Sequence, residues 1–167
     1  PRPFLKIWEP RYRKFLEDWN KVGWLQRPNI AYCTIVHVDE TDEKAIKAGL
    51  FRASRAYEGF LPPPQPGETF DERVRTHAKK FIGRGEPGAS EIMANLFDPD
   101  YLMEHELVFI GSPETVAKKI RAAAESGLFN TFMGEFNFSD LPEHDLMRSI
   151  RLFGEKVIPA LRAYEPF

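Results

Sequence analysis

The chain has 167 residues, of which 23 are lysine or arginine and 25 are aspartate or glutamate, so its formal net charge is −2. Its content of 43% apolar, 13% aromatic and 29% charged residues is typical of a globular chain and argues against a disordered or fibrous one. The near-neutral charge argues against a nucleic-acid partner, and no apolar run reaches the roughly 20 residues that a membrane helix needs.

The cysteine content points to a reducing compartment. Cys33 is the single cysteine, so an internal disulfide is impossible. The first residues also lack the basic-then-apolar pattern of a signal peptide. We therefore expect a cytoplasmic protein in which Cys33 is a small core residue, since no base motif adjoins it. The length favours a single domain over residues 1–167.

The first third of the chain predicts a helix, a strand and a second helix. Apolar residues at helical spacing indicate a helix over 9–22, which Gly23 ends. Residues 30–38 are rich in β-branched side chains and almost uniformly apolar, as in a parallel strand covered on both faces. Residues 39–42 offer N-cap oxygens for a helix over 42–58. The side chains expected to face inward on that helix are Ala45, Ile46, Gly49, Ala53, Ala56 and Tyr57.

Residues 59–105 form a long excursion between strands. The sequence over 61–67 is Leu-Pro-Pro-Pro-Gln-Pro-Gly, which cannot be regular helix. Two weaker helices are expected at 68–82 and 89–97, separated by a glycine-rich stretch. Because loops of this length are usually functional or disordered, we expect an insertion that acts as a lid.

The pattern is regular again after the excursion. Residues 107–110 predict a short buried strand, and Ser112 predicts an N-cap because Pro113 and an acidic residue follow it. Residues 129–134 predict another strand, and a loop over 135–142 leads to a last helix. The residues expected on the inner face of that last helix are Leu146, Ile150, Phe153, Val157 and Leu161. Pro159 is expected to kink or fray its final turn.

Strands that alternate with helices predict an α/β fold with a parallel sheet. Only three strands are visible, whereas a (β/α)₈ TIM barrel needs eight and typically about 250 residues. The sequence therefore looks like the last three βα units of a TIM barrel, with a helical and loop insertion between the first two visible strands.

Four segments resemble the luciferase-like flavin monooxygenases of bacteria. Residues 110–117, Ile-Gly-Ser-Pro-Glu-Thr-Val-Ala, resemble that family's seventh βα turn, and residues 36–45 resemble its sixth strand passing into a helix. Residues 132–138, Phe-Met-Gly-Glu-Phe-Asn-Phe, are similar to its eighth strand, and residues 149–162 to its closing helix. The resemblance covers about residues 25–163 and corresponds to the family's C-terminal half.

The resemblance implies a TIM barrel that binds reduced FMN, or in some members the deazaflavin F420. FMN-using members react the reduced flavin with O₂ and oxidise a small organic substrate, and a separate flavin reductase usually supplies the flavin. It therefore implies a flavin-dependent monooxygenase, and we expect a homo-oligomer. Two alternatives remain open: a non-catalytic half-barrel that acts as a binding or assembly module, and a deazaflavin-dependent dehydrogenase on the same fold.

Active sites of barrel enzymes lie at the C-terminal ends of the strands, which gives three candidate catalytic residues. His37 lies near the end of the first strand, where it is either a polar group aimed at flavin or substrate, or a histidine hydrogen-bonded inside the barrel. Glu135 and Asn137 follow the last strand at a spacing that puts them on one side of an extended chain. Alternatively, they belong to a solvated loop.

Four further residues are candidates for cofactor binding. Phe136 and Phe138 are expected on the side opposite Glu135 and Asn137. One of these two pairs would line the mouth of the barrel, and the other would pack under the last helix. Gly111 and Ser112 lie at a helix start that can bind a phosphate, although Ser112 also has the features of a plain N-cap.

The remaining polar and aromatic residues suggest no further cofactor. No metal site is expected, because the spacing of His77, His105 and His144 matches no zinc pattern. Trp8, Trp19 and Trp24 cluster near the N-terminus. They either seal the first helix onto the sheet or form a subunit interface.

Overall fold

The computed structural model of the chain describes residues 3–80, 82 and 88–162, and it contains one parallel three-stranded sheet. The strands are β1 (Ala31–Val38), β2 (Phe109–Gly111) and β3 (Thr131–Glu135), in the order β2-β1-β3. Both neighbours of β1 run parallel to it, with Val36 opposite Phe109 and Ala31 opposite Thr131. The predicted α/β class with parallel strands is therefore confirmed.

The strand order differs from that of three successive barrel units, in which each strand pairs with the next. Here the first strand is central and the second pairs only with its C-terminal part. The second strand is also shorter than predicted, since it begins at Phe109 rather than Leu107. The Leu107 carbonyl accepts a hydrogen bond from the Thr34 hydroxyl at 2.8 Å, so it is engaged by a side chain. The fold is thus an open parallel sheet.

Helices account for most of the remaining described chain. They are α1 (Pro3–Val22), α2 (Asp42–Ala45), η1 (Ile46–Leu50), α3 (Phe51–Ala56), η2 (Tyr57–Phe60), α4 (Phe70–Lys79), α5 (Ala89–Asn95), α6 (Pro99–Glu104), α7 (Pro113–Ala124), α8 (Glu143–Leu152), η3 (Phe153–Val157) and α9 (Ile158–Leu161). The segments η1 and η3 are π-helical turns, and η2 is a 3₁₀ turn. The helices predicted after β1 and after β3 are therefore each interrupted by a wider turn.

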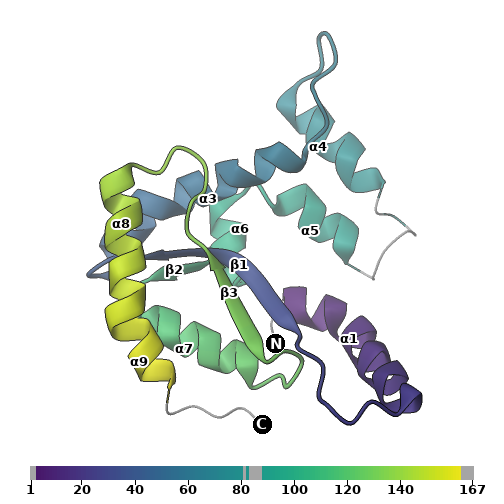
Figure 1. Cartoon of the computed structure of the whole chain (residues 1–167). Coiled ribbons are helices and arrows are strands. Elements are labelled where there is room, and N and C mark those ends of the chain that lie inside the picture. Colours follow the sequence, from purple (N-terminus) through teal and green to yellow (C-terminus); the bar gives the residue numbers. More distant parts are fainter. Residues whose placement is uncertain (1–2, 81, 83–87, 163–167) are drawn as a thin grey trace.

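Helices lie on both sides of the sheet (Figure 1), and an apolar cluster packs on each of its two faces. On one face, Tyr32, Val36 and Val38 of β1 pack against α7 and the chain from α8 to α9. On the other face, Ile35 packs with the helices after β1 and with α5 and α6. The second half of the predicted insertion, which contains α5 and α6, is therefore part of the core. Burial of these apolar side chains provides the main stabilisation of both layers.

The N-terminal half of β1 and the adjoining part of β3 leave one sheet face uncovered. Cys33 and Glu135 are exposed there, and the Met133 side chain is 51% exposed. Cys33 is therefore not a core residue, contrary to the expectation, because α5 and α6 cover only the C-terminal half of this face. No described strand pairs with the outer edge of β3.

For two helix residues, the prediction that the side chain faces the core is wrong. Ile46 is 38% exposed, and Ile150 is 43% exposed. The inner position on α8 is taken by Ser149, whose hydroxyl accepts a hydrogen bond from the Val38 backbone N–H at 2.8 Å. A polar contact with the sheet therefore replaces the apolar contact that the helical spacing indicated.

The long N-terminal helix α1 ends as predicted at Gly23, which has a φ of 80°. Trp19 and Trp24 contact each other edge to face, with ring centroids 4.2 Å apart, and the Trp19 indole donates to the Gln26 carbonyl. The side chain of Trp8 lies outside the described part of the structure. In the described chain, no helix is both long enough and apolar enough to span a membrane.

Candidate functional site

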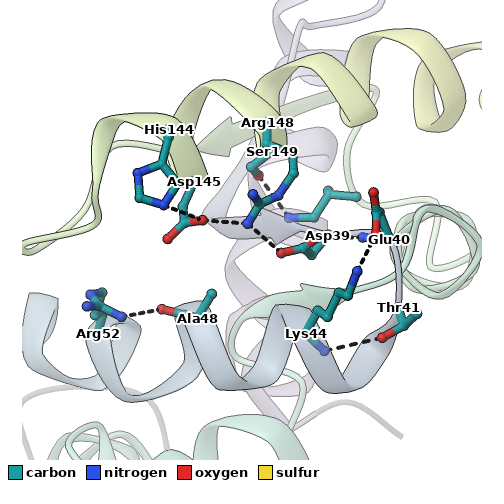
Figure 2. Close-up of polar contacts among 11 residues, drawn as sticks. Asp39, Glu40, Thr41, Lys44, Ala48, Arg52, His144, Asp145, Arg148 and Ser149 are labelled. Atoms are coloured by element: carbon teal, nitrogen blue, oxygen red, sulfur yellow. Dashed lines mark hydrogen bonds and ion pairs between the residues drawn. The ribbon is translucent and has the colours of Figure 1, made fainter.

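The C-terminal end of β1 is the point where the chain changes face. The helices after β1 pack on one face of the sheet, whereas α7 and α9, after β2 and β3, pack on the other. In open α/β sheets, ligands bind in the crevice outside the carboxyl ends of the strands at such a switch point. A polar crevice of about 450 Å³ lies here, between α8 and the helix that follows β1 (Figure 2).

One wall of the crevice holds an ion pair between a buried carboxylate and a partly exposed guanidinium. Asp39 is 2% exposed, and it accepts hydrogen bonds from the Arg148 guanidinium at 2.8 Å and from the Glu40 backbone N–H at 2.7 Å. The same nitrogen of Arg148 also donates to Asp145. Two carboxylates on different elements thus fix the guanidinium and balance the desolvation of the pair.

The opposite wall carries cations from the helix after β1. Lys44 pairs with Glu40 one turn away, and Arg52 lies two turns further along. The Arg52 guanidinium donates to the Ala48 carbonyl at 2.7 Å and lies 3.2 Å from the Asp140 carboxylate. Lys47 and Ala48 complete this wall.

His37 lies beneath the crevice and is completely buried. Neither ring nitrogen has a hydrogen-bond partner in the described structure, so the second of the two alternatives for His37, a histidine hydrogen-bonded inside the fold, is not found. Its ring lies edge-on to Phe138, with centroids 6.3 Å apart. Burial lowers the pKa of His37 from its ordinary value of 6.5, and the charges of Asp39 and Asp145 only partly oppose this effect.

The predicted phosphate-binding turn is occupied by a side chain of the protein itself. Ser112 is the N-cap of α7, as expected, and accepts from the Thr115 backbone N–H. The Asp42 carboxylate accepts from the Ser112 backbone N–H at 2.6 Å and from the Thr115 hydroxyl at 3.0 Å. A Cβ atom on Gly111 would lie 2.7 Å from Thr115 and 2.8 Å from Asp42, so only glycine fits beside this contact.

A second cavity lies over the uncovered half of the sheet and is mostly apolar. Its volume is about 560 Å³, which is within the usual range for small-molecule sites. The lining residues are Tyr32, Cys33, Thr34, Ile35, Ala56, Tyr57, Phe60, His77, Met93, Leu96, Leu107 and Glu135. Burial raises the pKa of Tyr57, so its phenol remains a neutral donor.

The predicted site residues do not form one constellation. Glu135 lines the apolar cavity, whereas Asn137 is exposed and lines neither cavity. Phe136 contacts Phe153 at 5.0 Å and packs with the α7 side, but Phe138 is buried with His37 on the other side. The expected pairing of the two phenylalanines on one face is therefore wrong, because the chain leaves the extended conformation after Glu135.

Sequence analysis missed most residues of the polar crevice. Arg148 donates to Asp145, three positions earlier on α8, and to Asp39 in an acidic turn about a hundred residues earlier. The sequence feature that could have identified the crevice is the group of basic residues on the helix directly after a strand: Lys44, Lys47 and Arg52. Within the described residues, no group of three or more potential metal ligands comes together.

Comparison with known proteins adds no relative to this description. No protein-family model matches the chain, and no curated protein matches it.

Proposed function

We propose that the chain forms part of a luciferase-like, flavin-dependent oxidoreductase, and that its apolar cavity receives the flavin ring or the organic substrate. The proposal rests on the four sequence segments that resemble this family and on their occurrence in an α/β fold with parallel strands. When bound, a reduced flavin would supply the oxidation chemistry with O₂, and the protein would orient the ring and exclude water.

The observation that carries the proposal is the composition of the apolar cavity. Tyr32, Tyr57 and Phe60 give it aromatic walls, and few polar groups line it. Glu135 can accept a hydrogen bond and the neutral Tyr57 can donate one, which is the pattern expected for orienting a flat heterocycle. The cavity is therefore suited to a ring system rather than to a highly charged ligand.

The fit of a flavin is partial. The apolar cavity suits the ring, but the start of α7 does not suit the phosphate, because the Asp42 carboxylate already takes the Ser112 N–H. An anion at Gly111 and Ser112 would be repelled by that carboxylate. The start of α7 is therefore not a site for the flavin phosphate in this chain.

The barrel belongs to the same proposal. In three successive barrel units β2 would lie between β1 and β3, whereas β1 is central here, so the barrel requires a different pairing of β2; further strands would pair with the free edge of β3. Their side chains would face the uncovered surface that includes Cys33 and Met133. The same uncovered surface favours a second candidate function, a non-catalytic module that assembles with another copy or another protein.

The single cysteine makes the cavity directly testable. Cys33 is exposed and lines the cavity, so the rate at which a thiol reagent modifies it reports occupancy. We expect FMN and riboflavin to slow the modification in a saturable manner, because both carry the ring. Titration with the deazaflavin in place of FMN distinguishes the two enzyme alternatives.

A cavity-filling substitution provides the control. Ala56→Phe places a ring in the cavity and should abolish protection by flavin, whereas Ala94→Phe, at an exposed position of α5 outside the cavity, should leave it intact. If no flavin protects Cys33 in the parent chain, the assignment of the cavity fails, and assembly measured by sedimentation becomes the remaining candidate.

A further inference from the structure

The polar crevice contains more positive charge than its carboxylates neutralise. Four cationic side chains and three carboxylates line it. Arg148 holds both Asp39 and Asp145, and Lys44 holds Glu40. The three carboxylates are therefore already engaged, so a metal cation would have to displace existing ion pairs.

Two cations on the opposite wall remain for a ligand. Lys47 makes no ion pair or hydrogen bond with any residue that the structure describes. The carboxylate partner of Arg52 is Asp140, whose side chain is 82% exposed and does not line the crevice. A solvent-exposed ion pair of this kind contributes little, and a better-placed anion can replace it.

The far wall offers a fixed guanidinium. Arg148 is held by Asp39, directly after β1, and by Asp145 on α8. The Arg148 side chain lines the crevice and is 37% exposed, so part of it is open to a ligand oxygen, with which a guanidinium forms a charge-assisted hydrogen bond. Lys47 and Arg52 line the same crevice from the helix after β1.

We propose that the crevice binds a phosphoryl group between α8 and the helix after β1. A phosphate presents several anionic oxygens, which can accept from Lys47 and Arg52 on one wall and from Arg148 on the other. The crevice lies beyond the carboxyl end of β1, where open α/β sheets bind ligands. The proposal rests on the crevice alone and does not require the apolar cavity to bind a flavin.

Calorimetric titration of the 167-residue chain with inorganic phosphate tests the proposal, with ionic strength held constant by chloride. We expect saturable binding at one site. Lys47→Ala should weaken it about tenfold, as expected for the loss of one charge-assisted contact. The control is Lys118→Ala on α7, an exposed lysine outside the crevice, which should bind phosphate like the parent.

Two results would overturn the proposal: heat that does not saturate with phosphate, or equal weakening in the Lys47→Ala and Lys118→Ala variants. Competition distinguishes the two sources of the group. If FMN displaces phosphate and riboflavin does not, the crevice binds a phosphate ester. If neither displaces it, the crevice binds free phosphate. Failure of flavins to protect Cys33, with phosphate still bound, would overturn the proposed function and leave the phosphate site standing.

Discussion

The buried imidazole of His37 links the stability of the protein to pH. Burial lowers its pKa in the folded state, so below about pH 6.5 the unfolded chain binds a proton that the folded chain does not. The stabilisation that comes from burying the neutral His37 ring is fully present above the pKa of the unfolded chain. It is lost as the pH falls from that pKa toward the lower pKa of the folded chain. We expect the free energy of unfolding, measured with urea, to decrease between about pH 7.5 and about pH 5.5.

A substitution separates His37 from other titrating groups. His37→Leu should reduce the decrease over that interval, because the leucine cannot bind a proton. His144→Gln on α8 is the matched control, since the His144 side chain is 74% exposed. The interpretation is wrong if the two variants show the same pH dependence.

Asp42 is the second residue whose role follows from its contacts. Its carboxylate connects the helix after β1 to the start of α7, and the Ser112 N–H hydrogen bond is the main cause of its lowered pKa. We expect Asp42→Ala to lower the free energy of unfolding by about 2 kcal/mol, the value of hydrogen bonds to a charged group. This stabilisation is present at neutral pH and is lost as the pH falls through the depressed pKa, below 3.8.

Chemical denaturation at neutral pH measures the effect of Asp42→Ala. Asp18→Ala on the exposed surface of α1 is the control, and it should change the free energy by about 0.5 kcal/mol or less. A loss for Asp42→Ala no larger than that of the control would show that the contact does not hold the two helices together.

At the scale of the elements, the two π-helical turns place their glycines in opposite environments. A Cβ atom on Gly49 in η1 would lie 2.8 Å from the His37 ring, whereas one on Gly154 in η3 would meet nothing within 4 Å. Gly49→Ala should therefore destabilise the protein by about 1 to 2 kcal/mol, because overpacking outweighs the better helix propensity.

Gly154→Ala is the matched substitution, and it should stabilise the protein by about 0.5 to 1 kcal/mol. Thermal denaturation of both variants at one pH measures the difference in sign. The double variant with His37→Ala should recover part of the stability lost in Gly49→Ala, because the neighbouring ring is removed. A neutral Gly49→Ala would mean that the close packing of η1 on β1 is absent in solution.

The elements that could be predicted are those with a local signal. Ser112 and Pro113 predicted the start of α7, and the structure confirms it. The helix α6 was missed although Asp98 and Pro99 have the same arrangement, with the Asp98 carboxylate accepting from two backbone N–H groups. The π-helical turns could not be predicted, because no local pattern in residues 46–50 or 153–157 indicates them, and the close approach of Gly49 to His37 joins two different elements.

At the scale of the whole molecule, the uncovered face of β1 and β3 favours association. Met133 is half-exposed beside Cys33, and no described strand covers the outer edge of β3. Exposed apolar sheet surface of this kind usually marks an interface. We expect sedimentation of the isolated chain to show self-association, and Met133→Lys should shift the equilibrium toward the monomer.

Phe51→Lys is the control for that experiment, because Phe51 is 67% exposed on α3 and belongs to neither apolar cluster that packs on the sheet. It should leave the association unchanged. A monomeric parent chain with a sharp thermal transition would contradict the prediction.

The strand order was the part of the fold that sequence reasoning could not supply. Alternating strands and helices fix the class, but neighbours in a sheet are set by contacts such as the Thr34 hydroxyl with the Leu107 carbonyl, 73 positions apart. The polar crevice could not be predicted for the same reason, since Arg148 and Asp39 come into contact only when β1 and β3 pair. The Cys33 environment likewise depends on which helices reach the sheet.

The two wide turns also govern how these helices tolerate insertions and deletions. A π-helical turn accommodates one residue more than an α-helical turn, and one residue corresponds to a rotation of about 100° about the helix axis. Loss of a single codon within 46–50 would restore a regular helix and swing Arg52 and Tyr57 away from the two cavities that they line. An in-frame deletion of one residue would thus change the side chains that line both cavities, while the strands and their pairing stay in place.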